Sequence, residues 1–204
     1  MKNIIYINLL VIGLTLSCKA QSPIVSLDAP TTTPSGAYLK DLNNELDKFE
    51  GTWIFTEGTI TFTITLEKKE MVYDGFKYYS DELFGAYSYT TNGVEIVNTF
   101  PLITETETDL DNTNIGGNYI IPNNLYVACD DCAPDERRVK LYFSDPERPY
   151  LSVSTVLRYI QDGNVPGQDE QITATIFPHG GMLPDENSPS TIRVPYGEYL
   201  MVKE

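Results

Sequence analysis

The chain of 204 residues is poor in the side chains that most often carry chemistry, with three cysteines, one histidine and one tryptophan. A structural zinc site needs about four nitrogen or sulfur ligands, more than His179 and the few thiols supply. No G-x-S-x-G elbow and no phosphate-binding glycine loop occurs. We therefore expect no metal, no cofactor and no enzymatic activity. A carboxylate-based hydrolase is the one catalytic alternative left open, because some of the 29 acidic residues could converge.

Basic residues are also scarce. Lysine and arginine together number 14 against 29 acidic residues, which gives a formal net charge of −15 at pH 7. A surface of this sign repels nucleic acids and anionic lipid head groups. We expect no nucleic-acid partner.

Long apolar runs are absent except at the start of the chain. Lys2 precedes an apolar stretch over residues 4–16 that is interrupted only by Asn8, Gly13 and Thr15. This stretch is too short for a permanent membrane span and is typical of a signal-peptide core. Residues 1–20 are therefore predicted to be a signal peptide, and the protein is predicted to be exported.

The end of this segment allows two modes of processing. Leu16-Ser17-Cys18 resembles a bacterial lipobox, in which Cys18 would be acylated, although Thr15 stands where an aliphatic residue is usual. The alternative is ordinary cleavage after Ala20. The expected location is a membrane-anchored lipoprotein in the first case and a periplasmic or secreted protein in the second. Contact with a membrane is expected only through the N-terminal lipid anchor.

The remaining two cysteines, Cys129 and Cys132, form a C-x-x-C motif. Asp130 and Asp131 inside the motif disfavour the thiolate that a redox-active pair requires. In an oxidising compartment we expect a disulfide that stiffens a hairpin tip. The adjacent Arg137 and Arg138 lead us to expect that one of them pairs with an acidic residue of the same loop.

Residues 21–36 are rich in proline, serine and threonine and are predicted to be a flexible tether. A single domain over residues 37–204 should follow. Its first element is predicted to be an amphipathic helix, because Leu39, Leu42, Leu46 and Phe49 are spaced 3, 4 and 3 apart and Gly51 follows.

From Gly51 onward, apolar and polar residues alternate with the period of a half-buried strand. Nine or ten strands are expected, among them 70–78, 83–90, 94–100, 118–128, 137–144, 150–161, 170–177 and 197–203. Such a meander favours an all-β, antiparallel up-and-down barrel, with a β-sandwich as the alternative. The residues expected to line the barrel interior are Ile60, Phe62, Ile64, Leu66, Val139, Leu141 and Phe143.

The junction Gly51-Thr52-Trp53 places a G-x-W motif at the opening of the first long strand. A short helix followed by this motif resembles the lipocalin and fatty-acid-binding superfamily. The resemblance implies that Trp53 plugs the closed end of a barrel and that a late arginine lies over its ring. Arg158 and Arg193 are the candidates for that arginine.

The chain is also similar, over nearly its full length, to an uncharacterised family of exported Bacteroidota proteins, a domain of unknown function. The similarity rests on these segments: 17–21 (SCKAQ), 41–47 (DLNNELD), 62–69 (FTITLEKK), 136–139 (ERRV), 183–187 (LPDEN) and 194–199 (VPYGEY). It implies compartment and lineage, and no activity.

Two main functions remain open. The barrel could enclose a small apolar ligand, which needs a cavity of roughly a few hundred Å³. Alternatively, it could be a structural or protein-interaction module of the cell envelope with a filled interior. A cavity would favour the first function, whereas a filled core with an exposed aromatic patch would favour the second.

Overall fold

The computed structural model describes residues 22–28, 33–102, 113–122, 124–161, 169–181 and 185–204. The predicted signal peptide and the acylation of Cys18 lie outside the described residues. Among those residues, no helix is long and apolar enough to cross a membrane.

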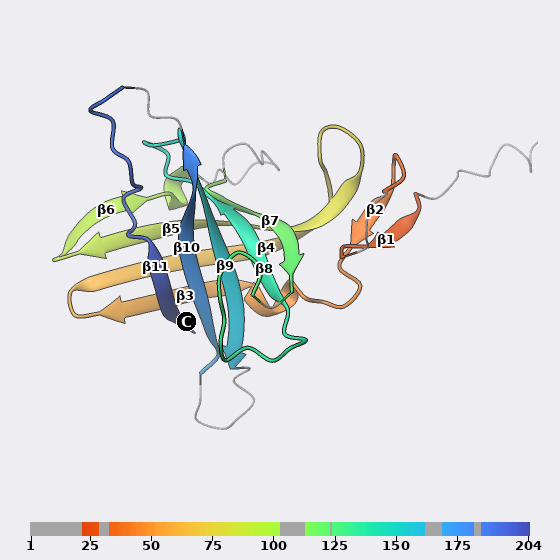
Figure 1. Ribbon diagram of the computed structural model, residues 1–204, viewed down its shortest axis with the longest axis horizontal. Coiled ribbons are helices and arrows are strands. Elements are labelled where there is room, and N and C mark those ends of the chain that lie inside the picture. The colour runs from red at the N-terminus through yellow and green to blue at the C-terminus, as the bar shows by residue number, and fades with distance from the viewer. Residues whose placement is uncertain (1–21, 29–32, 103–112, 123, 162–168, 182–184) are drawn as a thin grey trace, which may run out of the picture.

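The regular secondary structure of the described chain is almost entirely β-strand (Figure 1). In chain order the elements are β1 (Ile24–Ser26), β2 (Tyr38–Lys40), the 3-10 turn η1 (Asp47–Phe49), β3 (Gly51–Glu57), β4 (Ile60–Tyr73), β5 (Tyr79–Thr91), β6 (Val94–Asn98), the 3-10 turn η2 (Phe100–Leu102), β7 (Ile115–Ile121), β8 (Arg138–Phe143), β9 (Leu151–Gln161), β10 (Gln171–Gly181) and β11 (Gly197–Lys203).

Eight of these strands close into an antiparallel barrel in the order β5-β4-β3-β11-β10-β9-β8-β7. The ring closes at two places, where β7 pairs back onto β5 through Gly85↔Ile115 and β11 pairs with β3 through Lys203↔Trp53. Because neighbouring strands follow one another along the chain, apart from β6, the barrel is of the up-and-down type. The predicted all-β barrel is confirmed, and the alternative of a sandwich is not what the chain forms.

The alternating side chains set which face of each strand points inward. Phe62, Ile64 and Leu66 of β4 stand opposite Tyr89, Tyr87 and Gly85 of β5, and all of them are buried. At Gly85 the strands approach so closely that an added Cβ would lie 2.2 Å from the Thr65 carbonyl oxygen. Only glycine fits at this contact.

The number of barrel strands is lower than the nine or ten expected, because three strands lie outside the ring. β6 pairs with β5 alone, and β1 and β2 extend the sheet beyond the barrel. The strand expected at 70–78 is instead the end of β4, which continues past a bulge next to Met71. The strand expected at 118–128 ends at Ile121, where Pro122 follows.

The helix predicted at the N-terminal end of the domain does not form, and only the single turn η1 is helical. Buried Asp81 accepts a hydrogen bond from the Asp41 amide at 2.9 Å, and Asp41 in turn accepts from the amides of Glu45 and Leu46. These side-chain acceptors hold the backbone in turns and compete with helical hydrogen bonds. Leu42, which the helix would have buried, is 56% exposed.

Part of the expected tether belongs to the fold. Residues Ile24–Ser26 form β1, which runs parallel to β2, and β2 runs parallel to the start of β5 through Tyr38↔Tyr79. Strands β1 and β2 lie beside the β4–β5 turn at one end of the molecule (Figure 1).

Candidate functional site

Trp53 is fully buried at the end of the barrel where β3 begins. Its indole Nε1 donates a hydrogen bond to the Phe49 carbonyl oxygen at 2.8 Å, which ties the strand to the turn η1. The Lys203 Nζ lies 5.3 Å from the centre of the Trp53 ring. The cation over the ring is therefore a lysine of the last strand, and Arg158 and Arg193, the arginines suggested by the resemblance, bind carboxylates elsewhere.

The middle of the barrel is occupied by a cluster of aromatic rings around Phe62. The Phe62 ring centre lies 4.9 Å from that of Tyr199, 6.0 Å from Tyr89, 6.2 Å from Tyr87 and 6.5 Å from Phe143, all edge-to-face. This arrangement stabilises aromatic pairs beyond the burial of their area. The predicted lining residues lie in or against this core: Phe62, Ile64, Leu66, Val139, Leu141 and Phe143 within it, and Ile60 packed at its margin.

The exposure of these side chains shows how tightly the interior is packed. Phe62, Tyr87 and Phe143 are 0% exposed. The same holds for Trp53, Ile64, Leu83, Leu157 and Met201. A void that could hold even one water molecule would leave accessible area on the side chains around it. The interior around these residues is therefore filled by the protein itself.

Both ends of the barrel are covered. At one end, Leu46 and Phe49, in and next to the turn η1, are buried. The Lys68 ammonium forms ion pairs with Asp41 and Asp47 at the same end. Burial opposes the charged form of Lys68, but hydrogen bonds to the two carboxylates raise its pKa above the usual value. The N-terminal segment is thus fastened across this end.

At the opposite end, Asp145 is fully buried and binds Arg193. The Asp145 carboxylate accepts hydrogen bonds from the Arg193 backbone amide at 2.9 Å, from Nη2 at 2.6 Å and from Nε at 3.0 Å. Ile192 and Val194, on either side of Arg193, are buried in the core. Below them, the Tyr87 hydroxyl donates to the Ser144 carbonyl oxygen at 2.9 Å.

The outer surface carries a loop that folds back on the barrel between β7 and β8. Cys129 and Cys132 form a disulfide, as predicted. Arg158 of β9 fastens this loop through Glu136 at 2.5 Å and Asp131 at 2.9 Å. These carboxylates raise the pKa of Arg158 further above its usual value.

The two arginines after the disulfide have partners other than those expected. Arg137 forms ion pairs with Asp28 and Glu45 of the N-terminal segment and, within the part of its own loop that the structure describes, binds no acid. Arg138 is 2% exposed and donates to the Val127 carbonyl oxygen at 2.7 Å, while its Nε has no hydrogen-bond partner among the described residues. Burial lowers the pKa of Arg138. This arginine lines a groove of about 440 Å³ between the loop and β9, β10 and β11.

Beside this groove, aromatic and basic side chains from four segments meet on the outer surface. The Tyr126 ring lies 4.7 Å from the Lys140 Nζ, 6.1 Å from the Tyr119 ring and 6.2 Å from the His179 ring. The His179 ring also contacts the Phe177 ring at 5.0 Å. We call Tyr119, Tyr126, Lys140, Phe177 and His179 the outer aromatic face.

His179 lies at the exposed end of β10, and its Nε2 is 2.7 Å from the Oγ of Ser154 in β9. Burial and the nearby Lys140 lower the pKa of His179, so its ring is largely neutral at pH 7. The Ser154 hydroxyl is buried and not open to a substrate. The contact therefore positions the imidazole ring on the outer aromatic face and does not resemble a catalytic dyad.

These features define a closed, up-and-down β-barrel of eight antiparallel strands, filled around Phe62, with an aromatic patch on its outer wall. The chain belongs to a family of unknown function, DUF6705, whose profile matches residues 1–204. Comparison with curated proteins finds no match, and comparison with solved structures finds none either. The family's Bacteroidota lineage stays a prediction. The function therefore has to be inferred from the chain's own surface and interior.

The disulfide provides a first prediction. Replacing both Cys129 and Cys132 with serine should lower the free energy of unfolding by at most about 2 kcal/mol, because so short a closed loop restricts the unfolded chain little. Hydrogen exchange should rise in residues 124–136 and stay unchanged in β9, since Arg158 still holds the loop to the barrel. The wild-type protein measured under reducing conditions is the control. Faster exchange throughout the barrel would contradict a purely local role.

Proposed function

We propose that the protein is a non-enzymatic interaction module of the cell envelope, exported and anchored through an acylated Cys18, which binds a partner protein through the outer aromatic face. The observation that carries this proposal is that Phe62, Tyr87 and Phe143 in the middle of the barrel have no exposed area. A carrier of small apolar molecules needs a preformed cavity. An apolar ligand could enter the filled part of this barrel only by displacing rings that already pack against one another.

The outer aromatic face has the composition of a protein-binding surface. Tyrosine is enriched at interfaces because it offers a large, stiff contact area with a polar tip. Tyr119 and Tyr126 are each about half exposed. Tyr126 also has a φ of +68°, which a bulky residue rarely adopts. A conformation of this kind costs about 1–3 kcal/mol and is often found at functional sites.

The charge of the chain indicates the chemistry of the partner. Removal of residues 1–17, which makes the acylated Cys18 the N-terminal residue, takes away Lys2 and no acidic residue and leaves 13 basic and 29 acidic residues. Complementary potentials accelerate association and exclude partners of like charge. The net charge describes the surface around the outer aromatic face, whereas Lys140 within the face is a cation. The partner is therefore expected to present a basic surface around a region that accepts the two tyrosine rings and the Lys140 ammonium.

The test places a photo-crosslinking amino acid at position 126 in the native host, with position 57 as the control. Glu57 is exposed in the β3–β4 turn and lies outside the outer aromatic face. We expect one crosslinked partner from position 126 and none from position 57. With that partner purified, Tyr119→Ser combined with Tyr126→Ser should weaken binding tenfold or more, as expected for hot-spot residues.

A matched variant separates this effect from a general loss of surface tyrosine. Tyr73→Ser removes a tyrosine of similar exposure, 48% against 49% for Tyr126, from the β4–β5 hairpin and should leave the affinity unchanged. Binding should also weaken as salt is raised, because the partner is basic. A stoichiometric apolar molecule released when the host-purified protein is denatured would overturn the proposal in favour of a ligand carrier.

A further inference from the structure

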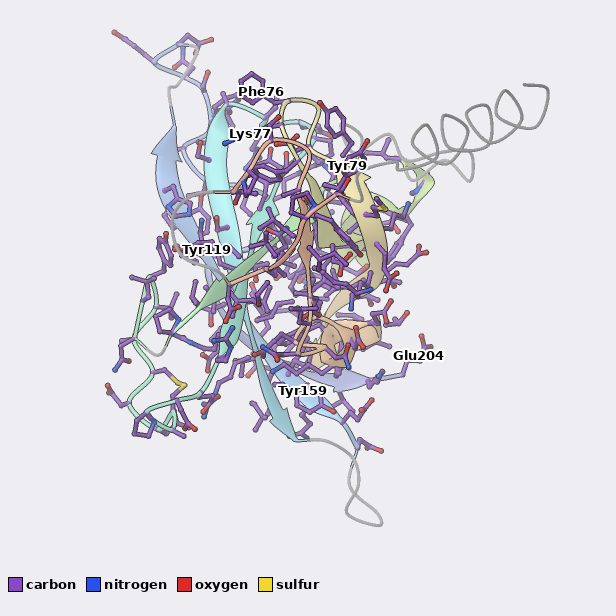
Figure 2. All side chains as sticks on the ribbon, turned by 90° about the vertical axis from the view of Figure 1, so that its right-hand side faces the viewer. Phe76, Lys77, Tyr79, Tyr119, Tyr159 and Glu204 are labelled. Atoms are coloured by element: carbon purple, nitrogen blue, oxygen red, sulfur yellow. A yellow bond between two sulfur atoms is a disulfide. The ribbon has the colours of Figure 1, made fainter. Side chains whose placement is uncertain are left out.

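The β4–β5 hairpin extends beyond the barrel and carries apolar side chains at its end. β3 accompanies β4 only as far as Leu66, and β7 accompanies β5 only from Leu83. Residues 67–82 therefore lie past the barrel rim, where β2 is the strand that pairs with β5. At the hairpin turn Phe76 is 86% exposed, and Met71 and Tyr73 are about half exposed. Figure 2 shows Phe76 and Lys77 at this turn, with Tyr79 where β5 begins.

The turn is held by hydrogen bonds although it is exposed. The Asp74 carboxylate accepts hydrogen bonds from the backbone amides of Phe76 at 2.9 Å, Lys77 at 2.6 Å and Tyr78 at 3.0 Å. The Tyr73 and Tyr79 rings lie 5.0 Å apart at its base. A fixed turn that presents a phenylalanine to solvent adds nothing to the barrel core and leaves the ring available for an external contact.

The direction of the N-terminal strands shows which external surface is nearby. β1, β2 and the start of β5 run parallel, with Ile24 beside Tyr38 and Tyr38 beside Tyr79. The residues preceding each of these strands therefore lie toward the hairpin turn, and the chain enters β1 from that side. Cys18 is four residues before Ser22, a span of at most about 14 Å.

We propose that the β4–β5 hairpin is a membrane-contact site, in which Phe76, Met71 and Tyr73 enter the head-group region of a zwitterionic lipid bilayer. The proposal rests on the acylation of Cys18 proposed above, since an acyl anchor within about 14 Å of Ser22 brings the bilayer to the hairpin side of the molecule. Aromatic side chains favour the membrane interface. A single apolar turn binds weakly alone, so it acts as the second contact that orients an anchored barrel. The net charge of the chain excludes anionic lipid as the preferred surface.

The test attaches a polarity-sensitive fluorophore to the acylated protein through Phe76→Cys, with Val94→Cys as the matched control. Val94 is an exposed apolar residue at the β5–β6 turn, at the end of β5 away from the hairpin turn. In phosphatidylcholine vesicles the label at position 76 should shift to the blue and be quenched by spin-labelled lipid, whereas the label at position 94 should do neither. A second protein carries the label at Tyr73→Cys. In it, the additional substitution Phe76→Ser should lower the ratio of membrane-inserted to withdrawn hairpin about tenfold, the factor expected for the loss of one large apolar side chain.

A second arm separates the failure of this proposal from a failure of the anchor. Residues 19–204 with an N-terminal histidine tag are held on vesicles that contain a nickel-chelating lipid, so that no acylation is needed. The label at position 76 could still be quenched on these vesicles although Cys18 is not acylated in the host. That result would support the membrane-contact site and would refute the acyl anchor. Labels at positions 76 and 94 that respond equally would overturn the proposal. So would a response at position 76 that requires added envelope proteins.

Discussion

Asp145→Asn is expected to lower the free energy of unfolding by about 3–5 kcal/mol, because it leaves a partly buried guanidinium without its main partner. Asp145 is fully buried and accepts hydrogen bonds from the Arg193 side chain and backbone. The Arg193 side chain is 14% exposed and has one other carboxylate, that of Glu147. Asparagine keeps the shape of the residue but removes the charge. Chemical denaturation at pH 7 measures the difference.

The same pair should make the protein sensitive to acid. Burial raises the pKa of Asp145, but the hydrogen bonds from Arg193 outweigh burial, and the folded-state pKa lies below the usual value. A lowered folded pKa means that the stabilisation is fully present above the unfolded pKa of about 3.9 and is lost as the pH falls through the folded value. Wild type should therefore lose stability more steeply below pH 4 than Asp145→Asn does.

Glu147→Gln is the control for this prediction. Glu147 also binds Arg193, at 2.7 Å, but its side chain is 73% exposed. An ion pair with one partner in solvent contributes about 0–1 kcal/mol. If Glu147→Gln destabilised the protein as much as Asp145→Asn, burial would not be what makes the Asp145 pair important.

The barrel itself could be predicted because its determinants are local. Alternation in residues such as Phe62, Ile64 and Leu66 reveals which face of a strand is buried, and short connections allow only neighbouring strands to pair. Whether the interior is hollow depends on how rings from distant strands fit together. Phe62 and Tyr199 are far apart in the sequence, yet their rings are 4.9 Å apart. The alternation of apolar and polar residues along a strand gives no information about that distance.

The predicted N-terminal helix, which does not form, shows where a local sequence pattern gives the wrong structure. The spacing of Leu39, Leu42, Leu46 and Phe49 is helical, but the segment is held in turns by Asp81, whose carboxylate binds the Asp41 amide from 40 residues away. A buried acceptor brought by a distant strand overrode the local periodicity. The two buried positions of the pattern, Leu46 and Phe49, still pack beneath the barrel.

The outer aromatic face could not be predicted for a related reason. Its members come from β7, β8, β10 and the disulfide loop, and become neighbours only when the barrel closes and the loop folds back on it. The partners of Arg137 and Arg158 were missed in the same way, because Asp28 and Asp131 are distant in sequence from the arginines that bind them.

Phe62→Ala is expected to be among the most destabilising substitutions in the chain, lowering the free energy of unfolding by about 3–5 kcal/mol. Phe62 is fully buried and contacts the rings of Tyr87, Tyr89, Phe143 and Tyr199. Its removal deletes these contacts and leaves a cavity, because strands paired on both sides cannot collapse into the space. Denaturant unfolding of the variant and of wild type measures the change. Phe76→Ala, at an 86% exposed position, is the control and should change stability little.

The cavity also makes Phe62→Ala a test of the filled barrel. An apolar cavity of this kind binds benzene or xenon, so benzene should raise the midpoint of thermal unfolding of Phe62→Ala and leave that of wild type unchanged. If the wild-type barrel already had room beside Phe62, both proteins would respond to benzene. The substitution would then cost nearer the 1.5–3 kcal/mol expected for transfer of the side chain alone. That pair of results would favour binding of a small apolar ligand as the function of the barrel. A response to benzene confined to the variant would instead support the outer wall as the surface through which the protein acts.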